Sequence, residues 1–204
     1  MWLTPLVILF LFLSGQPHMI LYVIIFAWLY AVYRFIQTES NIIIASGNLL
    51  IFSSACILGI GLAAFQLIRA FELYQLSTIN QAASQFIFKR DLVPMSHLYS
   101  IFIPNFFGNQ ATYNYWGRGD YIETVASVGL IPCFFTLLAI GYGPKNHKNL
   151  IGFFVATTII SVLLTINWYG SRLFFALGIP VLSSDVPSRI FVLTTFSLSI
   201  LAGI

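Results

Sequence analysis

The chain has 204 residues, of which 59% are hydrophobic and only 7% are charged, and its formal net charge is +3. A soluble domain carries about 25% charged residues, so the few charged side chains here cannot cover the surface of a water-soluble protein of this length. The composition predicts an integral membrane protein. The positive charge is small and dispersed, so we expect no nucleic-acid partner.

Six apolar runs are expected to form membrane helices, wholly or in part, because a bilayer core about 30 Å thick is crossed by about 20 apolar residues. Helix is expected for all of them, since isolated strands would leave backbone groups unsatisfied in lipid. In chain order they cover residues 2–13, 19–36, 42–68, 125–142, 150–168 and 190–204. The predicted fold class is all-α, a polytopic transmembrane helix bundle that forms a single domain over residues 1–204. The outermost runs are shorter than a span, so we expect a piece of a longer protein.

The connections between these runs fall into two kinds. Two are short, residues 37–41 and 143–149, and two are long, residues 69–124 and 169–189. The positive-inside rule gives weight to basic residues in short loops, so Lys145 and Lys148 place their loop in the cytoplasm. The long connections are then extracytoplasmic, and we expect them to carry short interfacial helices.

A polar turn, Gly15-Gln16-Pro17-His18, separates the first two runs. Glycine and proline break the chain sharply, so the side chains of Gln16 and His18 are expected at the outer edge of the membrane. Two interpretations remain open, an ordinary helix–helix turn and a turn that faces a substrate.

The third run contains Gly59 and Gly61, which permit the close approach of a neighbouring helix. Beyond them, Arg69 and Glu72 stand three residues apart, so on a helix they share one face and can pair. A structural ion pair and a ligand contact both remain open for these two residues.

A dense polar segment, residues 105–124, stands immediately before the fourth run and is called the polar island below. Asp120 and Glu123 suit a helix start, where acidic side chains cap free amides and meet the positive end of the helix dipole. That interpretation accounts well for Glu123 and only in part for Asp120.

The polar island also carries tyrosine and tryptophan residues and one arginine. Tyr113 and Trp116 fit either a sugar-stacking surface or an aromatic belt at the membrane interface, and both interpretations remain open. Arg118 lies between two glycines, which let the backbone bend around a ligand.

The segment Asp185-Val186-Pro187-Ser188-Arg189 precedes the last run, and its proline suits the first turn of a helix. Arg189 fits two roles, an arginine that snorkels to the membrane surface and a planar donor that holds a phosphate. Arg172 lies in the same outer connection and can contribute to such a site.

Other chemistry finds little support in the sequence. Cys56 and Cys133 fall inside apolar runs, so buried free thiols are expected in place of a disulfide. The three histidines have no ligand-like spacing, so we predict no metal site within this chain. No pattern typical of a nucleophilic triad or a phosphate-binding glycine loop is present.

Several motifs in a fixed order resemble a known family. They are Gly15-Gln16-Pro17-His18, residues 58–67 leading to Phe71-Glu72-Leu73, residues 104–108, Tyr121-Ile122-Glu123-Thr124 with residues 128–132, and Pro187-Ser188-Arg189. In this order they resemble the bacterial YfhO-like membrane proteins, which look like members of the GT-C superfamily of polytopic glycosyltransferases. Members of that family more often show Gly-His-Pro-Gln at the first motif, so Gln16 and His18 are exchanged here.

The resemblance implies a site on the outer face of the bacterial cell membrane. There a sugar would pass from a polyprenyl-phosphate carrier to a cell-envelope glycan or lipid acceptor. In such enzymes an acidic residue of the first outer loop usually serves as general base, and we expect that loop to precede Met1. No catalytic residue is therefore assigned, and a divalent metal is conceivable only for the longer protein.

Under this hypothesis Arg189, with Arg118 or Arg172, would neutralise the donor phosphate, and the polar island would shape a sugar site. The turn at residues 15–18, the Arg69–Glu72 pair and Arg189 are expected to be neighbours of the island. The substrate-binding residues predicted in this way are Gln16, His18, Arg69, Glu72, Tyr113, Trp116, Arg118, Asp120, Glu123, Arg172 and Arg189.

Two other classes of function remain as alternatives. A transporter or lipid flippase would carry ionisable residues near the middle of its spans, and these runs carry essentially none. A non-catalytic membrane scaffold would need no polar site at all.

Overall fold

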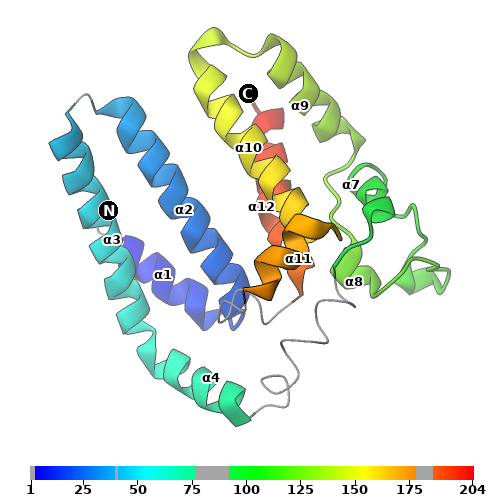
Figure 1. Ribbon diagram of the computed structural model, residues 1–204, viewed down its shortest axis with the longest axis horizontal. Coiled ribbons are helices and arrows are strands. Elements are labelled where there is room, and N and C mark those ends of the chain that lie inside the picture. The colour runs from blue at the N-terminus through cyan, green and yellow to red at the C-terminus, as the bar shows by residue number, and fades with distance from the viewer. Residues whose placement is uncertain (1–2, 40, 77–91, 178–185) are drawn as a thin grey trace. The chain divides into compact units, whose positions relative to one another are not determined.

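The computed structural model describes residues 3–39, 41–76, 92–177 and 186–204, and in these residues the regular structure is helical (Figure 1). The chain divides into two compact units, Met1–Gln81 and Ala82–Ile204. The prediction of an all-α fold is confirmed for the described residues. Asp185, which the sequence analysis placed in the segment before the last run, lies outside them.

The N-terminal unit contains four helices, α1 (Thr4–Leu13), α2 (Pro17–Thr38), α3 (Ile42–Leu62) and α4 (Ala64–Leu76). Their ends follow local chemistry. Pro17 begins α2 two residues after Gly15, whose φ of +85° suits glycine. The Asn41 side chain caps α3 by accepting the Ile43 N–H at 2.9 Å. The buried core of the unit joins α1, α2 and α3 and contains Ile8, Phe12, Ile20, Cys56 and Ala63.

Helices α1 and α3 approach closely at Gly59, as the sequence predicted. A Cβ atom added at Gly59 would stand 2.7 Å from the Ile8 Cβ and 2.8 Å from the Pro5 carbonyl oxygen. A Cβ atom added at Gly61 would meet nothing within 4 Å. Of the two glycines, Gly59 is therefore the one that the close approach requires.

The single helix expected over residues 42–68 is two helices in the structure. Helix α3 ends at Leu62, and α4 begins at Ala64 after a turn at Ala63, which is fully buried. The Gln66 amide donates to the Phe12 carbonyl at 3.1 Å and so fastens the start of α4 to the end of α1. Apolar composition continues through this break, which is why the sequence did not reveal it.

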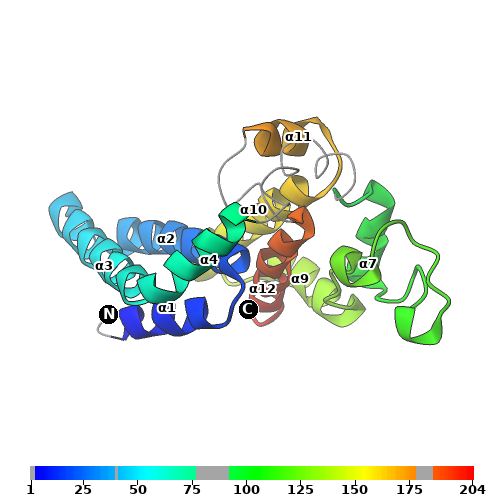
Figure 2. The same ribbon diagram turned by 90° about the horizontal axis from the view of Figure 1, so that it is seen from below.

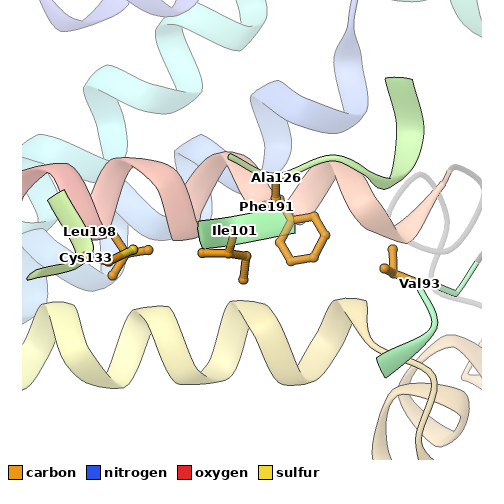
Figure 3. Close-up of a cluster of buried hydrophobic side chains, with 6 residues drawn as sticks. All are labelled: Val93, Ile101, Ala126, Cys133, Phe191 and Leu198. Atoms are coloured by element: carbon orange, nitrogen blue, oxygen red, sulfur yellow. The ribbon is translucent and has the colours of Figure 1, made fainter. Parts of the chain in front are cut away.

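The C-terminal unit is built on three apolar helices, α9 (Leu130–Tyr142), α10 (Lys148–Thr165) and α12 (Phe191–Ala202), with α12 packed against both others (Figures 1 and 2). Hydroxyl groups hydrogen-bond between them. Ser161 and Thr194 lie 2.7 Å apart across the α10–α12 contact, and Thr136 of α9 donates to the Leu198 carbonyl at 3.2 Å. Figure 3 shows the apolar core of the unit, formed by Val93, Ile101, Ala126, Cys133, Phe191 and Leu198.

Short helices occupy the connections, as expected. The long segment before α9 contains η1 (Met95–Leu98), α7 (Tyr99–Phe102), η2 (Gln110–Thr112) and α8 (Tyr121–Thr124). Helix η3 (Lys145–His147) leads into α10, α11 (Tyr169–Ala176) follows it, and η4 (Pro187–Ile190) leads into α12.

The fourth membrane run begins later than the sequence predicted. Helix α9 starts at Leu130 and not at Val125, because residues 125–129 are extended and Gly129 has a φ of +88°. The Ile101 carbonyl accepts hydrogen bonds from Val128 and Gly129, so this stretch pairs with α7 and does not continue a helix.

Three helices among the described residues are long and apolar enough to cross a membrane, His18–Thr38, Ile42–Leu62 and Lys145–Thr165. Three further apolar helices, Thr4–Leu13, Leu130–Tyr142 and Pro187–Ala202, are shorter than a span. The chain is therefore a membrane protein. A bundle with five or six crossings remains a prediction.

Candidate functional site

The polar island folds back on itself into a loop with its own hydrogen bonds. The Asn114 side-chain oxygen accepts from the Asn109 N–H at 2.8 Å and from the Thr112 hydroxyl at 2.7 Å. The Asn114 backbone also packs against Gly108, whose φ is +82°, so no Cβ fits there. These contacts hold Tyr113 at the tip of the loop in the left-handed conformation, with φ of 56°.

His97 fastens this loop to the body of the unit. The His97 imidazole is buried, its Nε2 accepts the backbone N–H of Arg118 at 3.2 Å, and its ring stacks on Phe107 with centroids 4.2 Å apart. The Phe107 ring in turn contacts the Trp116 ring, and the backbone N–H of Trp116 donates to the Phe107 carbonyl at 2.9 Å. Burial lowers the pKa of His97, so the imidazole is held neutral with Nε2 free to accept.

Sequence reasoning considered His97 only as a metal ligand and missed this role. The sequence does place this histidine in the largely apolar segment of residues 97–107. An imidazole buried in such a segment needs a polar partner. That partner is a backbone N–H in a distant loop, which no sequence spacing identifies.

The two acids at the end of the island have separate roles. Asp120 is the N-cap of α8, and its side chain accepts the Ile122 N–H at 3.2 Å. Glu123 lies in the first turn of that helix, but its carboxylate faces η4, where Ser188 donates to it at 3.4 Å and the Arg189 guanidinium lies at 3.6 Å. Both acids therefore stand at the start of α8 as expected, Asp120 as its N-cap and Glu123 in its first turn, and Glu123 in addition contacts η4.

Arg189 and Glu123 form the charged centre of the site. Their side chains are 27% and 32% exposed, so both are partly removed from water and still reachable from outside. The pair joins the end of the polar island to the start of α12, which confirms the expectation that Arg189 neighbours the island.

The tyrosine and tryptophan residues of the island, Tyr113, Tyr115, Trp116 and Tyr121, divide into two kinds. Tyr115 and Tyr121 are structural, because the Tyr115 hydroxyl lies 3.1 Å from the Thr124 hydroxyl and the Tyr121 hydroxyl donates to Asn105 at 3.0 Å. Tyr113 and Trp116 are 97% and 67% exposed. Of these four residues, Tyr113 and Trp116 are the ones that present a ring face to a ligand or to lipid.

The remaining predicted site residues lie elsewhere. Arg172 of α11 donates from Nε to the Asn167 side chain at 2.9 Å. In the N-terminal unit Arg69 and Glu72 form the expected ion pair at 3.2 Å, but their side chains are 80% and 56% exposed, so the pair contributes little to stability. Gln16 precedes α2 and His18 lies in its first turn. The proximity of these four N-terminal residues to the island stays a prediction.

The site offers anion chemistry more readily than metal chemistry. Among the described residues no group of three or more His, Cys, Asp and Glu side chains is placed to hold a metal ion, and Cys56 and Cys133 are buried free thiols. Comparisons of the chain with protein-family models, with curated proteins and with solved structures found no match. The chemical assignment therefore depends on the geometry and on the order of the sequence motifs.

Proposed function

We propose that the chain is part of a membrane glycosyltransferase. It would move a sugar from a polyprenyl-phosphate carrier to a cell-envelope glycan or lipid acceptor on the outer face of the bacterial cell membrane. The order of the motifs and the five or six apolar runs of a GT-C-like bundle support the reaction class. The observation that carries the site is the partly exposed Arg189 at the start of α12, next to Glu123 and Ser188.

The geometry at Arg189 suits a phosphate that can leave again. A charge-assisted N–H···O bond has a length of about 2.7–2.9 Å, so the 3.6 Å separation from Glu123 is a loose pair. A guanidinium presents two parallel donors to a phosphate, whereas the carboxylate here does not reach that geometry. A phosphate can therefore compete with Glu123 for Arg189.

The same arginine would stabilise the transition state of transfer. Negative charge grows on the carrier phosphate as the sugar leaves, and a fixed cation at that position typically contributes about 10²–10³ in rate. Arg118 would support it from the island, where His97 fixes its peptide. Arg172 of α11 would be the third arginine of the phosphate site.

The sugar would bind on the island. Tyr113 and Trp116 present exposed rings of the kind on which sugars stack, and the exposed Asp120 offers a carboxylate to sugar hydroxyls. No residue of this chain is proposed as the general base.

The test is transfer by the full-length protein in nanodiscs, with a polyprenyl-phosphate sugar as donor. Arg189→Ala and Arg118→Ala are each expected to lower the rate by about 10²–10³. Arg34→Ala is the matched control, because it removes an arginine of α2 that has no part in the proposed site. Transfer that is unchanged in both site variants would show that these arginines do not hold the donor phosphate.

A further inference from the structure

An exposed aromatic surface covers one side of η1, α7 and the loop that follows. Neighbouring rings contact each other on it, with Tyr99 and Phe106 centroids 5.2 Å apart and Phe106 and Trp116 centroids 6.3 Å apart. Its exposed members are Met95, Tyr99, Phe102, Ile103, Phe106 and Trp116. Exposed apolar side chains gathered along one segment, with three of their rings in contact, mark a contact with a partner or with a membrane.

The start of this segment is fixed to the end of a membrane helix. Val93 pairs with Ile166 in a β-bridge, in which the Val93 N–H donates to Thr165 at 3.1 Å and the Asn167 N–H donates to Val93 at 2.9 Å. Thr165 is the last residue of α10. The residues that lead into η1 therefore lie level with the end of that helix.

The length of the span places this end at a membrane boundary. The apolar helix Lys145–Thr165 has 21 residues, which at 1.5 Å per residue measure about 30 Å, the thickness of the bilayer core. Trp168 and Tyr169 follow it and are exposed, as is typical of residues at the headgroup level.

The end of α7 is fixed in the same way to another apolar helix. The Ile101 carbonyl accepts from the Val128 and Gly129 N–H groups at 3.3 and 3.2 Å, directly before α9 begins at Leu130. Segment η1–α7 is thus attached at both ends to the termini of apolar helices. Of these two helices, the one that ends at Thr165 is long enough to span, and its end is where a bilayer core meets its headgroups.

We propose that this aromatic surface is a membrane-interface platform, which packs against the boundary between lipid headgroups and acyl chains. Tyr99 and Trp116 have the amphipathic rings that favour this layer, while Met95, Phe102, Ile103 and Phe106 reach the acyl side. The platform holds Arg118 at the depth where phosphates of membrane-borne molecules lie. The proposal does not depend on glycosyl transfer.

Depth-dependent quenching of Trp116 tests the platform. The variant with Trp2, Trp28 and Trp168 changed to Phe keeps Trp116 as its only tryptophan. It is reconstituted in phosphatidylcholine vesicles whose acyl chains carry bromine either at carbons 6 and 7 or at carbons 11 and 12. We expect strong quenching by the shallow bromines, weaker quenching by the deep ones, and little quenching by iodide in the water.

Trp168 provides the reference for this measurement. A variant that keeps only Trp168 reports the level at which α10 ends, and we expect the two tryptophans to have the same depth profile. Quenching of Trp116 by iodide and not by brominated lipid would show that the surface faces water. Insensitivity to both quenchers would show that protein covers it, either a second copy or another part of this chain. Either outcome overturns the proposal.

A second measurement avoids the loss of the Trp28 and Trp168 hydrogen bonds. A nitroxide on Met95→Cys, with both native thiols buried, should be relaxed more by oxygen than by a water-soluble nickel chelate. The matched control is Asn146→Cys in η3, where the nickel chelate should dominate. Equal nickel accessibility at both positions would contradict the platform.

Discussion

The carboxylate of Glu123 lies 3.6 Å from the guanidinium of Arg189, and the two residues come from α8 and η4, which are far apart in the sequence. This separation is long for a charge-assisted bond, and each side chain is about one-third exposed. Glu123 therefore acts as a weak internal counter-ion for Arg189.

Replacing Glu123 by Gln is expected to strengthen phosphate binding at Arg189. Partly exposed ion pairs contribute about 0.2–1 kcal/mol, so the loss of competition should tighten binding of a short-chain polyprenyl phosphate by about 1.4- to five-fold. Binding is measured by titration of the detergent-solubilised protein. Glu39→Gln removes a carboxylate at the end of α2 that has no part in the proposed site and should leave the affinity unchanged. Weaker binding in Glu123→Gln would mean that Glu123 orients Arg189 for the ligand.

Acidification is expected to loosen the polar island through His97. Burial lowers the pKa of this imidazole, so below about pH 6.5 the unfolded chain takes up a proton that the folded loop resists. The stabilisation from His97 is complete above that pH and is lost as the pH falls through the lowered value. A protonated ring also cannot accept the Arg118 N–H, which makes that bond in the folded loop.

Hydrogen exchange of residues 113–119, corrected for the intrinsic pH dependence, measures this effect. Protection should fall between pH 7.5 and pH 5 in the unsubstituted chain. In His97→Gln, whose side chain does not titrate, the fall should disappear. His147→Gln, at an exposed histidine of η3, should keep it. A fall that persists in His97→Gln would assign the pH response to another group.

The helices could be predicted because a helix that crosses a bilayer needs about 20 apolar residues in a row, and such runs are visible in the sequence. The exceptions are the interruptions at Ala63 and Gly129, and both have a tertiary cause. Ala63 turns the chain where Gln66 bonds to Phe12, and Gly129 pairs with Ile101. Apolar composition is the same on both sides of such a break, so the sequence pattern does not record it.

The sequence identified the charged residues of the site, but it did not show which of them contact each other. Arg189 and Glu123 were identified because polar groups beside membrane runs are rare. Their contact with each other depends on the docking of α8 against η4. The role of His97 depends on the Phe107 ring and the Arg118 peptide, which reach it only after the loop has closed.

Helix packing in the N-terminal unit should be sensitive to one glycine. Gly59→Ala would put a Cβ within 3 Å of Ile8 and of the Pro5 carbonyl, so α1 must move, at a cost of about 1–3 kcal/mol. Gly47→Ala in the same helix meets nothing within 4 Å and should be neutral or stabilising by up to about 1 kcal/mol. Unfolding by titration with a denaturing detergent measures both. Equal stability of the two variants would show that α1 does not pack on α3 in this way.

Two serines of the C-terminal unit should respond oppositely to alanine. Ser161 is buried and lies 2.7 Å from the Thr194 hydroxyl, so Ser161→Ala should cost about 0.6–1.7 kcal/mol, the range measured for interhelical hydrogen bonds in membranes. Ser197 is equally buried, but among the described residues its hydroxyl has no hydrogen-bond partner. An unpaired buried hydroxyl is costly, so Ser197→Ala should stabilise the unit by about 1 kcal/mol. The same detergent titration measures both, and a loss of stability in Ser197→Ala would mean that a bound water or lipid group satisfies this hydroxyl.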